Sequence, residues 1–272
     1  MLSDGAATAG PASSPGERLP SGSKIAPMRR VAVAIFKGGT GKSTVAVNVA
    51  VGLARRGRRV LVVDLDAQAN ASQMLGAADG RPTIREVLVD RVPPDEAARA
   101  VEPNLSVLPA NRSLAPIEAW LSTQVRREEV LRQRLAPLAE RDVVILDCAP
   151  AWSFLNINGL LYADEVWIPV SMDFLALVGV QQLEDTFDML RDELGHELRK
   201  RVIPTFFDGR TRKAGEVLAA LAERYGDAVL PPLRTSVRVS EAPSFGRSIF
   251  DHAPGSSAAA DFERLVDAID RG

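Results

Sequence analysis

The chain has 272 residues, of which 46% are hydrophobic and 25% are charged, values that are ordinary for a globular protein. Its formal net charge is −2, so no overall positive field attracts nucleic acid, and any such contact must come from a local basic patch. The single cysteine, Cys148, excludes an internal disulfide and a metal site built from clustered cysteines.

Residues 1–27 are rich in Ser, Gly, Pro and Ala, and we predict that they form a disordered tail because they offer little apolar surface to bury. They lack the charged-then-apolar pattern of a signal peptide. No apolar run in the chain is as long as a membrane span. We therefore expect a cytoplasmic protein with no membrane contact, whose folded domain covers residues 28–272.

A glycine-rich segment, K-G-G-T-G-K-S-T, lies between a predicted strand at 31–35 and a predicted helix at 44–56. Glycines let backbone N–H groups approach a phosphate closely, and the helix adds free N–H groups and its positive dipole end. Lys42 would bind the β- and γ-phosphates, and the Ser43 hydroxyl would ligate Mg²⁺. The standard phosphate-loop pattern has glycine at the position of Phe36, so the match fails by one residue. The predicted phosphate site comprises Lys37, Gly38, Gly39, Thr40, Gly41, Lys42, Ser43 and Thr44.

Carboxylates follow two further apolar runs, at 60–63 and 143–146. Asp64 and Asp66 come after the first, and would face the same side if that strand continued through them. Asp147 comes after the second, in the Walker B arrangement, where it would hold Mg²⁺ or its water beside Ser43. The carboxyl ends of parallel strands form the ligand crevice of such sheets. The alternative for Asp64 and Asp66 is that they are two solvated turn acids, and many strands without such a role also end in Asp, as the run before Asp147 does.

The remaining pattern alternates strands with helices. We predict strands at 105–108, 166–170, 202–207 and 229–233, and helices at 118–138, 176–194, 214–225 and 257–269. Thr83 and Glu86 have the spacing of a capping box, which predicts another helix start. This alternation is typical of an α/β fold, a doubly wound, mostly parallel sheet with helices on both faces in a single domain.

Two groups of basic residues near the C-terminal third stand out on this slightly acidic chain. Arg210, Arg212 and Lys213 are close in sequence, and Arg234 and Arg238 are four apart, so they would share a helix face. Such a patch would bind DNA phosphates without reading the base sequence. The alternative is a solvated charged surface.

Five stretches in the same order resemble the ParA-type partition ATPases of the ParA/MinD family. The resemblance covers about residues 29–270, and small departures from the family pattern occur at Ala67, Ala69 and Ala149. The stretches are K-G-G-T-G-K-S, V-D-L-D-A-Q-A-N-A-S at 63–72, I-L-D-C-A-P at 145–150 with I-N-G-L after it, F-D-G-R-T at 207–211, and V-R-V-S-E-A-P-S-F-G at 237–246.

The resemblance implies an ATPase that uses ATP and Mg²⁺. Lys37 then corresponds to the signature lysine, which reaches across a homodimer to the partner's nucleotide, and Asp66 to the carboxylate that positions the attacking water. Catalysis would depend on Lys37, Lys42 and Asp66, and Mg²⁺ on Ser43, Asp66 and Asp147, with support from Asp64. Pro243 would lie near the base. Arg210 and Arg238 match DNA-binding positions of the family.

The implied function is a switch that dimerises with ATP, binds double-stranded DNA non-specifically and associates with the nucleoid. A ParB-like or cargo-adaptor protein would stimulate slow hydrolysis, so that a chromosome, a plasmid or a protein cluster is positioned. A MinD-like membrane regulator is less favoured, because the predicted closing helix is acidic. A reductase like the nitrogenase iron protein needs two bridging cysteines per subunit. A scaffold without hydrolysis is disfavoured by Asp66.

Overall fold

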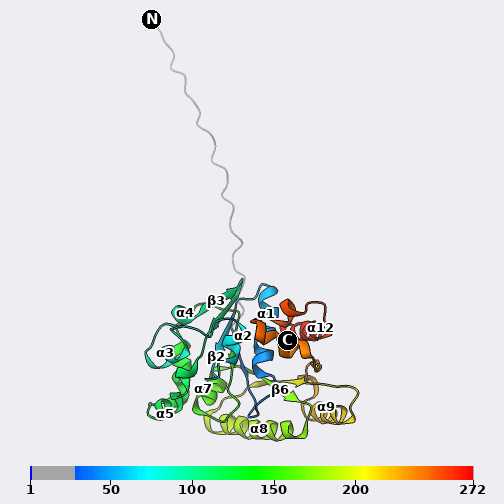
Figure 1. Ribbon diagram of the computed structural model, residues 1–272. Coiled ribbons are helices and arrows are strands. Elements are labelled where there is room, and N and C mark those ends of the chain that lie inside the picture. The colour runs from blue at the N-terminus through cyan, green and yellow to red at the C-terminus, as the bar shows by residue number, and fades with distance from the viewer. Residues whose placement is uncertain (2–27, 272) are drawn as a thin grey trace.

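Seven strands form one sheet in the order β3-β4-β2-β5-β1-β6-β7 (Figure 1). The computed structural model describes Met1 and residues 28–271, so the predicted tail lies outside the described residues apart from Met1. Every neighbouring pair is parallel except β3 and β4. The strands are β1 (Arg29–Val33), β2 (Val60–Asp64), β3 (Arg99–Glu102), β4 (Leu105–Leu108), β5 (Val143–Asp147), β6 (Glu165–Ser171) and β7 (Arg199–Thr205).

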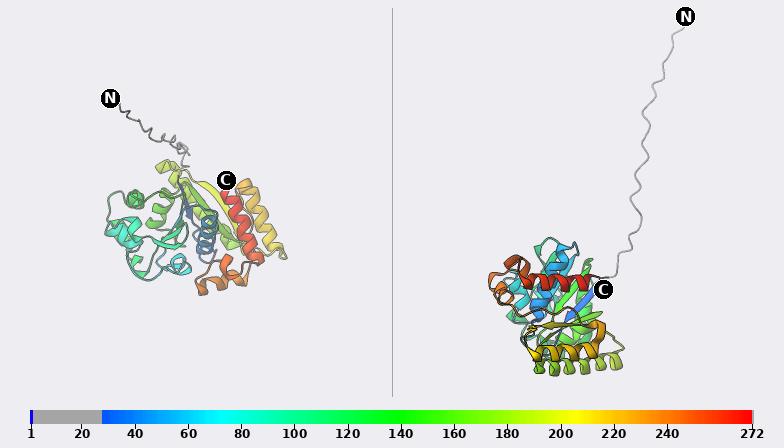
Figure 2. Two further views of the ribbon diagram at one scale, coloured as in Figure 1. Left: turned by 90° about the horizontal axis from the view of Figure 1, so that it is seen from above. Right: turned by 90° about the vertical axis from the view of Figure 1, so that its right-hand side faces the viewer.

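Helices cover both faces of the sheet, which confirms the doubly wound α/β prediction (Figure 2). Side chains alternate along the strands, so that Val31 and Val33 of β1 enter one core and Ala32 enters the other. The first core lies under α1 (Lys42–Arg55), α2 (Asn70–Met74), α11 (Ile249–His252) and α12 (Ser257–Asp270). The second lies under α3 (Ile84–Val89), α5 (Ile117–Ser122), α6 (Val130–Leu135), α7 (Phe154–Tyr162), α8 (Phe174–Leu194) and α9 (Arg212–Tyr225).

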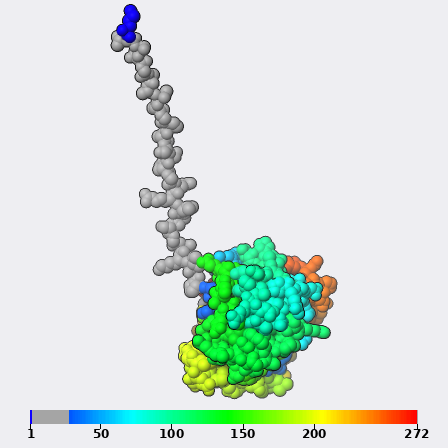
Figure 3. Space-filling model, turned by 90° about the vertical axis from the view of Figure 1, so that its left-hand side faces the viewer, coloured from blue at the N-terminus to red at the C-terminus, as the bar shows by residue number. Residues whose placement is uncertain are grey.

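Short elements complete the surface. They are α4 (Pro94–Ala97), α10 (Val237–Glu241) and the 3₁₀ turns at Arg112–Leu114, Arg127–Glu129, Gly226–Ala228 and Ala242–Phe245. In the space-filling view the segment from α2 to α6, in cyan and green, forms one broad surface with the yellow-green of α8 below it (Figure 3). Among the described residues no helix is both long and apolar enough to cross a membrane.

Two predicted elements differ from the structure, and one strand in the structure was not predicted. The helix expected at 118–138 is split into α5, a 3₁₀ turn and α6, because residues 122–129 bury no side chain that would hold a helix against the core. The strand expected at 229–233 makes only isolated bridges, at Val229 and nearby at Arg234, because Pro231 and Pro232 have no N–H to donate. The edge strand β3 was not predicted, since its sequence R-A-V-E carries little apolar alternation.

The topology places one loop at the centre of the molecule. β1 lies between β5 and β6, with β2 on one side and β7 on the other, so the chain order reverses around it. The loop that leaves β1 therefore opens into the crevice at the carboxyl ends of the strands. The capping box is confirmed at α3, where Thr83 and Glu86 bond reciprocally, and Gly57 ends the turn after α1 with a φ of 85°.

Candidate functional site

The loop between β1 and α1 has the backbone of a phosphate cradle. Gly39 and Gly41 have φ values of 73° and 89°, in the left-handed region that glycine adopts without strain. Helix α1 starts at Lys42, and Gly41 has no side chain that would cap it. The first N–H groups of the helix, together with its positive dipole end, thus point towards the crevice and are suited to bind an anion.

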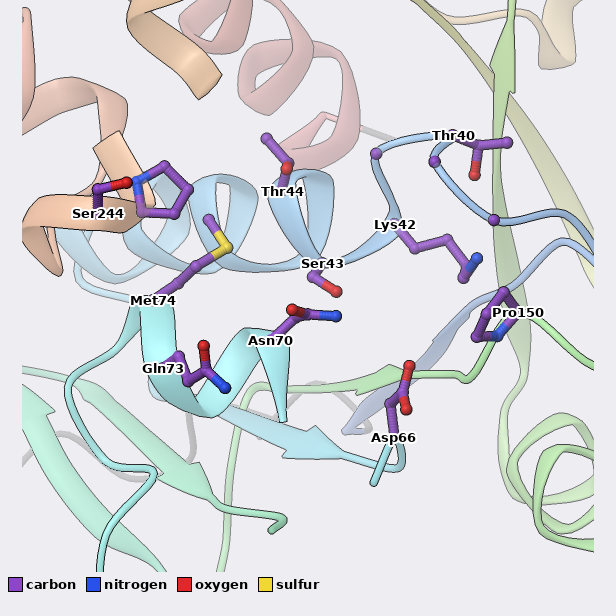
Figure 4. Close-up of a pocket in the computed structure, with 14 residues that line it drawn as sticks. Thr40, Lys42, Ser43, Thr44, Asp66, Asn70, Gln73, Met74, Pro150 and Ser244 are labelled. Carbon is purple, nitrogen blue, oxygen red and sulfur yellow. The ribbon is translucent and has the colours of Figure 1, made fainter. Parts of the chain in front are cut away.

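A cavity of about 390 Å³ lies over this loop (Figure 4). Three of the segments that line it are the loop itself, the turn after β2 through Asp66, and the last 3₁₀ turn through Pro243. The sequence predicted that all three belong to one site. In Figure 4 the side chains of Lys42, Ser43 and Asp66 surround one space. The lining residues are Gly38, Gly39, Thr40, Gly41, Lys42, Ser43, Thr44, Asp66, Asn70, Gln73, Met74, Pro150, Pro243 and Ser244.

Lys42 is a buried cation, with 7% of its surface exposed. Its Nζ donates a hydrogen bond of 2.9 Å to the carbonyl oxygen of Lys37. Burial lowers the pKa of the Lys42 ammonium, and the nearby carboxylates of Asp147 and Asp66 work against this shift. A desolvated ammonium beside a ring of N–H donors is strongly suited to phosphate oxygens.

Asp147 is fully buried, and neither of its carboxylate oxygens has a hydrogen-bond partner among the described residues. Burial raises the pKa of Asp147 well above its ordinary value, and its register partner Asp64 adds to the shift, whereas Ser43 and Lys42 oppose it. An unpartnered carboxylate near a serine hydroxyl offers the oxygen ligands that Mg²⁺ prefers. These residues therefore fit a magnesium ion.

The two acids after β2 have different environments. Asp64 accepts hydrogen bonds from the N–H of Asp66 and from both the N–H and the hydroxyl of Ser72, so its carboxylate anchors the start of α2. Burial raises the pKa of Asp64 to about 6. Asp66 lines the cavity, and its Oδ1 accepts from the N–H of Gln68. β2 ends at Asp64, so strand alternation does not extend to Asp66.

Lys37 does not line the cavity of its own chain. Its Nζ lies 2.6 Å from Oδ1 of Asp173 and 3.4 Å from the hydroxyl of Ser171, at the end of β6. The two lysines of the loop therefore have different partners, one buried against the loop carbonyl and the other paired with a carboxylate.

Comparison with known proteins agrees with this geometry. A family model described as an AAA domain matches residues 28–200. The chain is 39% identical over 249 residues to the chromosome-partitioning ATPase Soj of Thermus thermophilus, covering 90% of this chain and 96% of that protein. It is 37% identical over 234 residues to the chromosome partitioning protein ParA of Caulobacter vibrioides, covering 82% and 86%. The chain belongs to the ParA family of P-loop ATPases.

A solved structure extends the agreement to the fold. It is a Mycobacterium smegmatis protein described as cobyrinic acid a,c-diamide synthase with bound ATP analogue and magnesium. This chain is 32% identical to it, with a TM-score of 0.77 and coverage of 90% and 94% of the two chains. The ParA-type fold predicted from the sequence is thereby confirmed.

Some residues of this ParA-family site were not predicted. Asn70, Pro150 and Ser244 lie within the stretches that carry the resemblance, but Gln73 and Met74 gave no signal in the sequence. A second cavity of about 230 Å³ adjoins the first and shares Gly41, Thr44 and Pro243 with it. Phe206 lines this cavity with a φ of 52°, a backbone conformation that is rare for an aromatic residue.

The basic residues predicted to contact DNA are mostly exposed and mostly paired with acids. Arg210 pairs with Asp208, Arg212 with Glu216 and Arg238 with Glu241. Lys213 lies over the ring of Phe174. Arg210, Arg212 and Lys213 gather at the start of α9, whereas Arg238 belongs to α10.

The prediction that Arg234 and Arg238 lie on one helix face is wrong. Arg234 lies before α10 rather than on it, so the two side chains do not share a helix face. The Arg234 guanidinium forms a double hydrogen bond with Asp261, whose side chain is 1% exposed, and also bonds the carbonyl oxygen of Ser257. Its role in the structure is to dock α12, and this partner lies 27 residues away along the chain.

Arg234→Ala is therefore expected to lower the stability of this ParA-family domain. It removes the side-chain hydrogen bonds from Arg234 to a buried carboxylate, which keeps Arg264 and the N–H of residue 234 as partners, so the loss should be modest but measurable. Urea unfolding followed by circular dichroism measures the change. Arg238→Ala is the matched control and should leave the free energy of unfolding unchanged within about 0.5 kcal/mol. Equal stability of the two variants would contradict a docking role for Arg234.

Proposed function

We propose that the protein is an ATP- and Mg²⁺-dependent switch that forms a homodimer with ATP, binds double-stranded DNA non-specifically and hydrolyses ATP slowly when a ParB-like or cargo-adaptor protein stimulates it. The cycle serves to segregate a chromosome or plasmid, in the cytoplasm and on the nucleoid. The observation that carries the proposal is the Asp147 carboxylate, which has no hydrogen-bond partner in the described part of the chain and lies beside the buried Lys42 under a glycine loop at the centre of the sheet.

The residues at the cavity have distinct tasks in this proposal. Lys42 and the loop N–H groups bind the β- and γ-phosphates, and Ser43 and Asp147 hold the metal directly or through water. Bound Mg²⁺ supplies positive charge that neutralises the phosphates. Asp66, which lines the cavity, orients the water that attacks the γ-phosphate and supports the metal shell. Pro243 lies between the two cavities, which supports its assignment near the base.

The dimer part of the proposal is supported by apolar residues next to Lys37. Phe174, Leu175 and Val178 start helix α8 and are 61%, 70% and 55% exposed. Asp173, which bonds Lys37, immediately precedes them. Exposed groups of large apolar side chains mark interaction surfaces. A second subunit that covers this face would bring Lys37 close to the nucleotide bound by that subunit.

The DNA part is supported by the exposure of Arg210, Arg212, Lys213 and Arg238, whose ion pairs are at the surface and therefore weak. DNA phosphates can replace the acids as partners. A dimer doubles the number of such cations, so ATP should raise DNA affinity. The test is DNA binding with and without ATP at several salt concentrations. Affinity that does not depend on ATP or on salt would contradict the proposed switch.

Arg238→Glu is expected to weaken DNA binding at least tenfold and to reduce the salt dependence, because each subunit loses a phosphate contact and gains a repulsive charge. ATP-dependent dimerisation should persist. Fluorescence anisotropy with labelled DNA gives the affinity, and light scattering gives the oligomer. Arg224→Glu, at the far end of α9, is the charge-matched control. Loss of both dimer and DNA binding would instead assign Arg238 a folding role.

The same cycle can position a protein cluster instead of a DNA molecule. The adaptor protein that stimulates hydrolysis determines which cargo is moved. Imaging the replication origin in cells that lack the gene separates these cargoes. Scattered origins support segregation, whereas correctly placed origins support a protein cargo.

A further inference from the structure

We propose that Asp173 is a counter-ion that holds Lys37 within its own subunit and thereby opposes dimerisation until the partner's nucleotide competes for the lysine. The inference rests on the proposed function, because it requires that Lys37 leave its present partner to reach a nucleotide in the second subunit. Asp173 is thus a positioning residue for a lysine of the ATP site.

The ion pair is the strongest contact of the Lys37 ammonium among the described residues. Nζ lies 2.6 Å from Oδ1 of Asp173, and a longer contact of 3.4 Å joins it to the Ser171 hydroxyl. Ser171 is the last residue of β6, which lies next to β1 in the sheet, and Asp173 follows it as the N-cap of α8. The pair therefore bridges the phosphate loop and the start of α8.

Asp173 is held in place independently of Lys37. Its Oδ1 accepts the N–H of Ala176 at 3.0 Å as the N-cap of the 21-residue helix α8, and its Oδ2 accepts the Ser171 hydroxyl at 2.7 Å. Gly179 on the same helix lies so close to the loop that a Cβ there would be 3.3 Å from Cβ of Lys37. When the lysine moves away, the carboxylate thus keeps two hydrogen bonds and its position.

The Asp173 carboxyl is also disposed to remain ionised. Burial opposes its ionisation, but the hydrogen bonds from Lys37, Ser171 and the Ala176 N–H together outweigh burial and lower its pKa. The lysine therefore faces a full negative charge. A triphosphate carries more negative charge than one carboxylate and can compete with it for the ammonium.

The strength of the pair suits a reversible restraint. The side chains of Lys37 and Asp173 remain 24% and 33% exposed, so solvent screens their attraction and each pair should change an equilibrium by about two- to fivefold. A dimer breaks two such pairs, so the effect on the dimer dissociation constant should be on the order of four- to 25-fold, the square of the single effect.

Asp173→Asn tests the restraint, because the amide oxygen retains the N-cap of α8 while the charge is lost. With the non-hydrolysable analogue AMPPNP and Mg²⁺, sedimentation should give a dimer dissociation constant about four- to 25-fold lower than that of the wild type. Asp185→Asn, the same charge change on the exposed face of α8, is the control and should leave the constant unchanged. In a Lys37→Ala background, Asp173→Asn should produce no further change.

The outcomes separate the two proposals. A wild-type protein that stays monomeric with the analogue would contradict the proposed function. A wild type that dimerises, with Asp173→Asn no tighter than Asp185→Asn, would overturn the restraint alone. Weaker dimerisation of Asp173→Asn with an unchanged unfolding temperature would also overturn it. Ser171→Ala is a second variant that loosens the carboxylate without removing its charge, and should tighten the dimer by about twofold or less.

Discussion

Replacing Lys42 with alanine should abolish ATP binding at millimolar nucleotide. The ammonium is buried beneath the loop, so its hydrogen bonds to phosphate oxygens would form away from bulk water. Each charge-assisted bond is worth about 1.5 to 3 kcal/mol, and loss of two of them weakens binding on the order of a hundredfold or more. Titration with a fluorescent ATP analogue in the presence of Mg²⁺ measures the affinity.

The fold of the Lys42→Ala protein should be retained, because the wild-type side chain is a desolvated cation whose removal relieves a burial penalty. Lys213→Ala, which removes an exposed lysine at α9, is the matched control and should bind nucleotide normally. Near-normal affinity in Lys42→Ala would mean that the loop N–H groups alone hold the phosphates. DNA binding of Lys42→Ala should not respond to ATP.

The local features of the site were predictable because they depend on residues close in sequence. A buried strand, glycines and a helix start identify the phosphate loop, and the observed φ values of Gly39 and Gly41 confirm why glycine is required. Asp147 follows from the end of a buried apolar run. In each case strand ends and helix starts determine where the side chain points.

Features that depend on distant partners were not predictable. Arg234 has the same spacing from Arg238 as two residues on one helix face, yet Asp261 binds it to α12. Lys37 has the sequence context of a phosphate ligand, but its partner in the single chain is Asp173, 136 residues away. No periodicity in the sequence encodes such pairs, because they arise only when the sheet brings β1 and β6 together.

The different environments of Asp64 and Asp66 also could not be predicted from the sequence pattern, although the two acids are only two positions apart. In the sequence both acids follow the same apolar run, and strand alternation, if it continued, would treat them alike. The start of α2 separates them, since Ser72 binds Asp64 while Asp66 is left facing the cavity. The task of each acid is therefore set by the turn that follows the strand, which includes Ala69 with a φ of 57°.

Asp66→Asn should remove hydrolysis while leaving nucleotide binding intact. The amide keeps the size of the carboxylate and the hydrogen bond that its oxygen accepts from Gln68, but it cannot hold a water as a base or as a charged acceptor. Loss of such a group lowers rates by about 10² to 10⁴-fold. Steady-state phosphate release, with DNA and excess ATP, measures hydrolysis, and Asp79→Asn on a surface loop is the control.

The Asp66→Asn protein should also accumulate as the ATP-bound dimer, because the ATP hydrolysis that normally dissociates the dimer no longer occurs. Its DNA affinity with ATP should equal that of the wild type with AMPPNP, and should persist for as long as ATP is present. Phosphate release at the wild-type rate would show that another group orients the water. Loss of ATP binding would instead place Asp66 chiefly in the metal shell, because hydrolysis and dimerisation would then fail together.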